Sequence, residues 1–120
     1  MSNAVAQESP TPSDPEDQKL ITLARAALGR TGAAQGAAVR DTEGRAYAAT
    51  SVHLEHLKLS AVAVAVAMAV SSAASGLDAV AVAGVPPSED DLDLLRDLAG
   101  SGVAVWSADA RGRVLAVTRL

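Results

Sequence analysis

The stretch LSAVAVAVAMAVSSAA, residues 59–74, decides the fold of this 120-residue chain. It holds sixteen residues and no charge, Gly or Pro. Its alternating Ala and Val suit a strand as well as a buried helix. Because strands average about 5 or 6 residues and Ala has the highest helix propensity, the length predicts a helix. A segment that is apolar on every side must be covered on every side, so this helix is predicted to be the central buried element.

The same stretch is too short to cross a bilayer. A spanning helix needs roughly 20 apolar residues, and this run ends at Ser71 and Ser72. The N-terminal sequence MSNAVAQESPTPSDPEDQ has neither the basic start nor the apolar core of a signal peptide. No membrane association is predicted, and the small side chains of the stretch favour packing on a sheet or on a second copy of the chain.

Turn and cap residues divide the rest of the chain into short elements. Residues 1–15 are rich in Ser, Pro and Ala and are predicted to form a disordered tail, followed by a single domain over residues 16–120. The elements expected around the central helix are a helix that starts within residues 13–17 and is ended by Gly29 and Gly32, strands at 36–40, 45–49, 77–84, 103–106 and 113–118, and a helix starting at Ser88. Residues 50–58 look polar and irregular. This order predicts an α/β fold with a mixed five-stranded sheet and helices on both faces.

The composition argues against several classes of function and of site. A net charge of -4 and an isoelectric point near 5.0 argue against a nucleic-acid surface. Tyr47 and Trp106 are the only aromatic residues, which is a poor supply for stacking on bases. The chain has no Cys, so it can form neither a disulfide nor a thiolate metal site. We expect a reducing, cytoplasmic location.

The element order resembles that of the cytidine deaminase family over about residues 18–118. The hairpin opening at Gly36-Ala37-Ala38-Val39 and turning at Asp41-Thr42-Glu43-Gly44 is part of this resemblance. It implies a three-layer αβα sandwich. In that family a Cys-Ala-Glu or His-Ala-Glu triplet opens the second helix and a Pro-Cys-x-x-Cys motif opens the third. The first residue of the triplet and the two later Cys hold zinc, whose bound water attacks the pyrimidine ring while the Glu transfers protons.

At these motif positions the chain departs from the family pattern. The triplet aligns with Ser60-Ala61-Val62, so Ser60 stands at a ligand position and Val62 at the position of the Glu. The second motif aligns with residues 87–91, which puts Ser88 and Asp91 at the thiolate positions. Ser hydroxyls are weak zinc ligands, and one carboxylate cannot replace three strong donors. We therefore expect no zinc, no catalytic residue and the loss of an acceleration worth at least about 8 kcal/mol in ordinary enzymes.

A third family feature is an Asn-x-Glu-Asn sequence that resembles a grip for the nucleoside sugar. This chain reads His53-Leu54-Glu55-His56 there. The resemblance implies that Glu55, with His53 and His56, is a remnant of the substrate site. The alternative is that all three are ordinary exposed loop residues. His53 and His56 could also form a new metal site with Asp91, although two His at this spacing arise often by chance.

The remaining polar residues at helix starts have simpler interpretations. Ser60 and Ser88 could be nucleophiles, but neither has an obvious base or a Gly-x-Ser-x-Gly context, and helix capping explains both. Acidic residues cluster at the start of the last helix, and we interpret them as a solvated helix start that suits the helix dipole rather than as a cation site. They are Glu89, Asp90, Asp91 and Asp93.

Three functional hypotheses follow. The first is a cytidine deaminase-like protein without catalysis that works as a homo-oligomer, a dimer or tetramer, or binds an unidentified protein partner. Family members assemble through helices around the active-site region, and the 59–74 helix could form such an interface. The second is a nucleoside-binding module that uses Glu55. The third is a genuine cytidine deaminase of pyrimidine salvage with an altered metal site at His53, His56 and Asp91.

Overall fold

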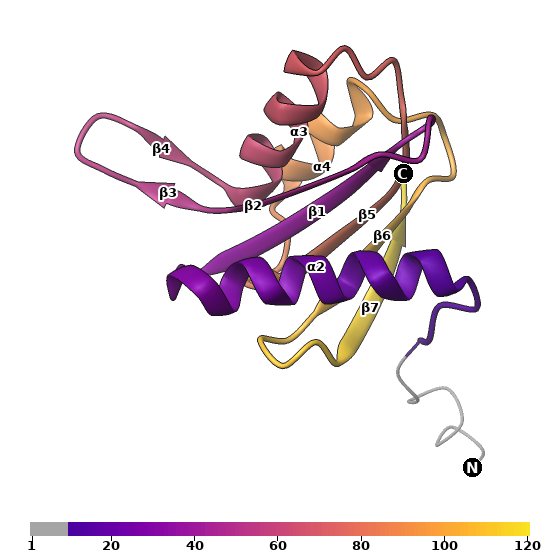
Figure 1. The fold of residues 1–120 in the computed structure, drawn as a ribbon, viewed down its shortest axis with the longest axis horizontal. Coiled ribbons are helices and arrows are strands. Elements are labelled where there is room, and N and C mark those ends of the chain that lie inside the picture. Colours follow the sequence, from indigo (N-terminus) through magenta and orange to yellow (C-terminus); the bar gives the residue numbers. More distant parts are fainter. Residues whose placement is uncertain (1–9) are drawn as a thin grey trace.

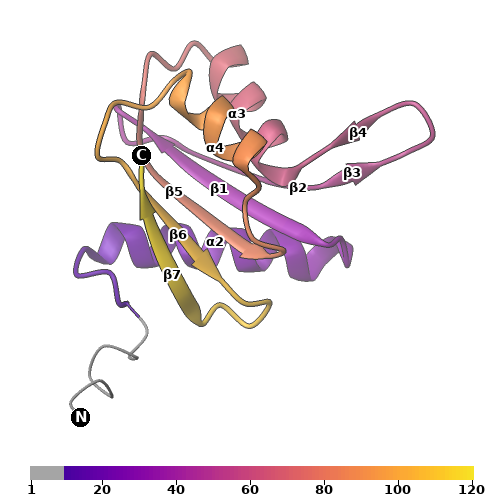
Figure 2. The same cartoon turned by 180° about the vertical axis from the view of Figure 1, so that it is seen from behind.

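The structure is a computed structural model that describes residues 10–120, so most of the predicted tail, residues 1–9, lies outside the described residues. Its main feature is a five-stranded sheet (Figures 1 and 2). The β5–β6 pair is parallel and the other three neighbouring pairs are antiparallel, so the predicted mixed sheet is confirmed. In spatial order the strands are β2 (Ala46–Thr50), β1 (Gln35–Asp41), β5 (Leu77–Gly84), β6 (Ala104–Ala108) and β7 (Val114–Arg119).

Helices cover both faces of this sheet, as predicted. Helix α2 (Pro15–Thr31) lies across one face, and α3 (Ala61–Ser71) and α4 (Glu89–Arg96) lie on the other (Figure 1). The core is accordingly split into two buried clusters. One joins α3 and α4 to the sheet through Val62, Val80, Leu95 and Val105, and the other joins α2 to the sheet through Leu20, Ala24, Ala81 and Trp106. The fold is the expected three-layer αβα sandwich.

Helix α2 begins where the sequence predicts, and it runs through Gly29 to end at Gly32, the second of the two glycines expected to stop it. The Asp14 side chain accepts a hydrogen bond from the Glu16 backbone N–H, and Pro15 occupies the first turn, where a missing N–H costs nothing. The helix stops at Gly32, whose positive φ of 67° closes the last turn. Gly36 allows the close packing of this helix on β1, because a Cβ there would lie 2.3 Å from the Ala24 carbonyl oxygen.

Strand β5 is the central strand, and its bounds match the predicted strand. Its Val80 and Val82 face the α3 and α4 side, whereas the small Ala79, Ala81 and Ala83 face α2. A strand covered on both faces has no polar side, which explains why its sequence is apolar from Ala79 to Ala83, after the exposed Asp78 at its beginning. Small side chains toward α2 and larger ones toward α3 and α4 set the spacing of the two helical layers.

Helix α3 corrects the prediction that residues 59–74 form a central element covered on every side. It spans only Ala61–Ser71 and lies in the outer layer of the sandwich. Ala61, Val62, Ala65 and Ala69 are buried, but the opposite side of the helix is open, with Met68 and Val70 at 40% and 55% exposure. An outer-layer helix is covered only by its sheet and its neighbour α4, and a uniformly apolar sequence does not encode which side that is. Within residues 10–120, no helix has the length and apolar character needed to cross a membrane.

Residues 50–58 are not the irregular segment that the sequence suggests. Val52–His53 forms β3 and Lys58–Leu59 forms β4, and the two pair antiparallel as a sheet of their own. The Leu54 N–H donates to the Leu57 carbonyl oxygen at 2.8 Å and closes the turn. This hairpin, residues 52–59, is called the arm below. It projects away from the sandwich beside the start of α3 (Figure 1), and residues 53–59 are all exposed.

Asp41 organises the turn between β1 and β2. Its side chain is 1% exposed and accepts hydrogen bonds from the backbone N–H groups of Glu43 and Arg45, each at 2.9 Å. The Arg45 Nε–H and the Tyr47 hydroxyl donate to its second oxygen, also at 2.9 Å. Four donors around one carboxylate make this turn depend on the charge of Asp41.

This arrangement predicts a pH-dependent contribution to stability. Burial by itself raises the pKa of the Asp41 carboxyl, but the hydrogen bonds from Arg45, Tyr47 and Glu43 outweigh burial and hold that pKa below its ordinary value of 3.8. A group whose pKa is lowered by folding stabilises the fold above its unfolded pKa, and this contribution is lost as the pH falls through the folded pKa. Asp41→Asn should therefore destabilise the protein at neutral pH, and its difference from the wild type should shrink below pH 3.8. Urea unfolding at a series of pH values measures this difference.

Thr42→Ala is the control for this experiment, because Thr42 lies in the same turn and does not ionise. The difference in the free energy of unfolding between Thr42→Ala and the wild type should not change with pH. A gap between wild type and Asp41→Asn that stays constant down to the acid unfolding transition would contradict the assigned role of the Asp41 charge.

Candidate functional site

The three residues that the resemblance assigns to zinc-ligand positions lie at the first turns of α3 and α4, which pack side by side. The Ser60 hydroxyl caps α3 by accepting from the Ala63 N–H at 3.0 Å. The Ser88 hydroxyl caps α4 by accepting from the Asp91 N–H at 3.0 Å. The capping interpretation of both serines is therefore confirmed.

Asp91 links the two caps. It accepts a hydrogen bond of 2.6 Å from the Ser60 hydroxyl on one carboxylate oxygen and one of 3.0 Å from the Ser88 backbone N–H on the other. The structure thus brings together the three residues that the alignment assigned to the ligand positions, in what we call the Ser60–Ser88–Asp91 cluster. Asp91 is only 5% exposed, so its prediction as part of a solvated acidic start is wrong. Its partners on two helices offset the cost of burying its charge.

The donor set of this cluster does not fit zinc. A protein zinc site uses thiolates, imidazoles or carboxylates in tetrahedral geometry, whereas the cluster offers two neutral hydroxyls and one carboxylate. Each hydroxyl accepts a backbone N–H, and both carboxylate oxygens are engaged with the two serines. Over residues 10–120, no group of three or more His, Cys, Asp and Glu side chains is arranged to hold a metal ion. That the protein binds no zinc stays a prediction.

Val62, which the resemblance assigns to the position of the proton-transferring Glu, is fully buried. It belongs to the core cluster that joins α3 to β5, β6 and α4, where it packs with Val80, Leu95 and Val105. An isopropyl group cannot accept or donate a proton, and its neighbours in the cluster are apolar. This position has a packing role in the fold.

Gln35 is a residue of the site that the sequence analysis did not single out. Its side chain is 4% exposed, and its amide N–H donates to the Val85 carbonyl oxygen at 3.0 Å. Its amide oxygen accepts from the Ala61 backbone N–H at 2.9 Å. Gln35 therefore ties the start of β1 to the first turn of α3 and to the loop that leads into α4. The only signal in the sequence was a polar residue directly before an apolar strand.

The residues proposed for sugar or metal binding lie on the arm and are not brought to the cluster. His53 is on β3, and Glu55 and His56 are at the tip, with side chains 86% and 89% exposed. The Glu55 carboxylate and the His56 imidazole pair with each other at 2.9 Å. Asp91, by contrast, is buried at the start of α4. The structure does not assemble the alternative metal site of His53, His56 and Asp91, because the arm directs its tip away from the sandwich (Figure 1).

One open surface cavity adjoins the cluster at the base of the arm. Its volume is about 580 Å³, and Ser60, His53, Lys58 and Ser51 provide its polar lining. Glu55 and His56 are not part of it. A small ligand in this cavity would therefore contact His53 and Lys58 rather than the retained Glu.

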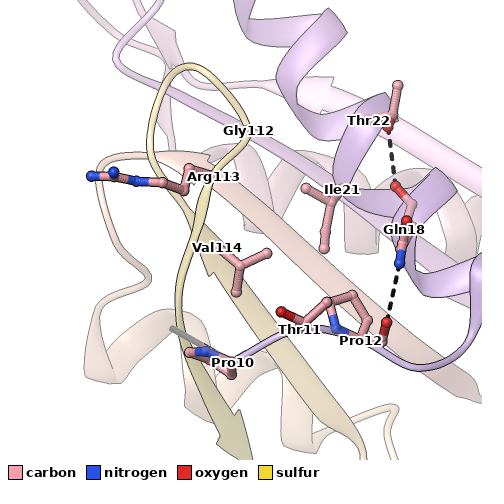
Figure 3. Close-up of a pocket in the computed structure, with 9 residues that line it drawn as sticks. All are labelled: Pro10, Thr11, Pro12, Gln18, Ile21, Thr22, Gly112, Arg113 and Val114. Atoms are coloured by element: carbon pink, nitrogen blue, oxygen red, sulfur yellow. Dashed lines mark hydrogen bonds between the residues drawn. The ribbon is translucent and has the colours of Figure 1, made fainter. Parts of the chain in front are cut away.

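A second cavity lies far from the cluster, on the α2 side of the sheet. Figure 3 shows it between residues 10–12, the first turns of α2 and the turn that leads into β7, with a volume of about 330 Å³. The Gln18 side-chain amide donates to the Pro12 carbonyl oxygen at 3.1 Å and holds the segment before α2 in place. None of the residues predicted for catalysis, substrate or metal lines this cavity.

Comparisons with known proteins agree with this architecture. Among solved structures, the cytidine deaminase from Burkholderia pseudomallei has a TM-score of 0.73 and 22% sequence identity, with 84% of this chain and 90% of that chain covered. The cytidine deaminase from Mycobacterium leprae has a TM-score of 0.67 and 19% identity over the same shares. At sequence identities of 19% and 22%, the similarity to these structures shows the fold alone. A search of curated proteins finds no match.

The sequence itself carries the family assignment. The family model described as cytidine deaminase-like matches residues 13–112, which include every element from α2 to β6 and the Ser60–Ser88–Asp91 cluster. Element order, sheet topology and this match agree. The chain belongs to the cytidine deaminase-like family.

Proposed function

We propose that this protein is a member of the family without catalysis and that it acts by assembling with a second copy of itself. The observation that carries the proposal is the Ser60–Ser88–Asp91 cluster, in which the side chains at the ligand positions hold one another and the two helix starts. The buried Val62 supports the same conclusion, because an apolar core side chain occupies the position assigned to the proton-transferring Glu.

The first part of the proposal rests on what metal-dependent hydrolysis requires. Such a reaction needs a metal that lowers the pKa of a bound water and a nearby group that transfers the proton. Opening the cluster to a metal would remove a cap from each of two helices, and each cap is worth about 1 kcal/mol. The cluster therefore stabilises the fold in a way that competes with metal binding.

The second part rests on exposed apolar surface. Eight large hydrophobic side chains are exposed within residues 10–120, and five of these lie on the arm or on the open side of α3. Helix α3 carries no charged residue that would keep this side in water. Covering the exposed portions of the five would favour association by on the order of 5 kcal/mol, before the costs of association. The five are Leu54, Leu57, Leu59, Met68 and Val70.

A cytoplasmic location is part of this proposal. It rests on the absence of Cys from all 120 residues, which suits a reducing compartment.

Elemental analysis of protein purified without an affinity tag or chelator tests the loss of catalysis. We expect far less than one zinc per chain, and no release of ammonia from cytidine or deoxycytidine above a protein-free blank. Zinc near one per chain, together with activity that a chelator removes, would contradict the proposal and support a cytidine deaminase with an altered site. His53→Ala and His56→Ala would then be the first variants to assay.

A nucleoside-binding module is the second candidate, and the cavity at the base of the arm is the observation in its favour. His53 and Lys58 offer hydrogen bonds there, and Ser60 forms part of the wall. Within residues 10–120, no Phe, Tyr or Trp lines the cavity to stack on a base. Calorimetric titration with cytidine, deoxycytidine and uridine decides between a module and an assembling protein, with His53→Ala as the cavity variant and the exposed His56→Ala as its control. Flat titrations with the wild type would remove this candidate.

A further inference from the structure

The arm has little support from its own chain. It pairs only two residues on each side, Val52 with Leu59 and His53 with Lys58, and it forms no part of the five-stranded sheet. An isolated two-stranded hairpin is at best marginally stable in water. Leu54 and Leu57 at its tip are 60% and 48% exposed. An arm of this kind is expected to gain its stability from a surface that covers the two leucines.

A suitable surface lies on the open side of α3. A groove of about 390 Å³ runs along the helix between β2 and the base of the arm, lined by Leu59 at one end and by Tyr47, Val64 and Met68 along its length. None of its lining residues carries a charge. The arm of the same chain points away from the sandwich (Figures 1 and 2), so its tip does not fill this groove.

We propose that the arm of each copy docks in the α3 groove of a second copy, so that two chains exchange arms about a two-fold axis. The proposal rests on the proposed self-assembly and names the surface that carries it. Each docking contact would bury Leu54 and Leu57 of one chain against Met68 and Val64 of the other. Because the contact occurs twice in a two-fold dimer, both arms and both grooves are covered at once.

The dimensions of the two parts support a second copy as the occupant. From Val52 to Glu55, three residue steps, the arm extends about 10 Å at the rise of a strand, and the eleven residues of α3 extend about 16 Å at the rise of a helix. Leu59 belongs to the base of the arm and also to one end of the groove. With the two bases side by side at the axis, each tip lies over the partner's groove and points toward its far end.

One cationic side chain lies near that far end. Arg45 lies beside Tyr47, since its Nε–H and the Tyr47 hydroxyl donate to the same Asp41 oxygen, and its side chain is 47% exposed. Glu55 is the acidic residue at the arm tip and is 86% exposed. Docking brings the Glu55 carboxylate toward the Arg45 guanidinium, which also pairs at 2.9 Å with Glu43 of its own chain, so one cation stands between two exposed carboxylates at the rim. At the rim such a pair favours orientation more than affinity.

Light scattering and analytical ultracentrifugation of four proteins test this exchange. The wild type is expected to be a dimer. The arm variant, Leu54→Asp with Leu57→Asp, and the groove variant, Met68→Asp, are expected to be folded monomers, with dissociation constants raised at least about 100-fold. Leu115→Asp on β7 is the control, because Leu115 is 51% exposed and lies outside arm and groove. It should remain dimeric.

Mixing the two variants provides the decisive measurement. The arm variant keeps an intact groove and the groove variant keeps an intact arm, so an equimolar mixture should form a heterodimer through the one remaining contact, although each protein alone is monomeric. Circular dichroism confirms that both variants are folded. A mixture that stays monomeric, or an arm variant as dimeric as the wild type, would overturn the arm exchange and leave self-assembly standing. A monomeric wild type would overturn the proposed assembly itself.

Discussion

Replacing Val62 with Glu is expected to lower the free energy of unfolding by more than about 3 kcal/mol, or to prevent folding. Val62 is fully buried among apolar side chains that join α3 to the sheet. A carboxyl group there would lose its hydration and find neither a cation nor a hydrogen-bond donor. The substitution would introduce the residue type that the family uses for proton transfer, at a position that this chain uses for packing.

Val85→Glu is the matched control, because it is the same chemical change at a valine that is 51% exposed, in the loop before α4. It should alter the free energy of unfolding by no more than about 0.5 kcal/mol. Urea unfolding followed by circular dichroism compares the two variants at one protein concentration. If Val62→Glu were as stable as Val85→Glu, the first turn of α3 would have to be open enough to hold a charged group. The burial of position 62 would then no longer argue against catalysis.

Gln35→Met should lower the free energy of unfolding by about 2–4 kcal/mol. The substitution keeps the length of the side chain but leaves the Ala61 N–H and the Val85 carbonyl oxygen without their side-chain partner. Each buried polar group left without a hydrogen bond costs about 1–3 kcal/mol. The loss arises at the junction of α3 with the loop that leads into α4, so the Ser60–Ser88–Asp91 cluster should loosen with it.

Gln18→Met is the control for this prediction. Gln18 also donates its amide to a backbone carbonyl, that of Pro12, but it is exposed on α2, where water can replace the lost bond. Gln18→Met should lower the free energy of unfolding by less than about 1 kcal/mol. Hydrogen exchange at the Ala61 amide separates local from global effects, because Gln35→Met should speed exchange there and Gln18→Met should not. Equal losses of stability in the two variants would contradict the bridging role of Gln35.

The candidate site was predicted in part from the sequence. Ser60 and Ser88 could be identified as helix caps because capping is local and depends on residues within one turn. The contact between Ser60 and Asp91 joins residues 31 positions apart, and no local pattern announces it. Gln35 was missed for the same reason, since its partners Ala61 and Val85 come from other parts of the chain.

The sequence by itself determined the order of the elements of the main sandwich, the mixed sheet, the ends of α2 and the bounds of β5, because turn residues, caps and apolar runs act over a few neighbouring positions. Only the tertiary structure decided which side of α3 is open, that residues 52–59 form a projecting arm, and that Asp91 is buried between two helix starts. The physical reason is that burial is a property of what packs against a residue. An apolar helix such as α3 has the same sequence pattern whether its uncovered side meets water or a second chain.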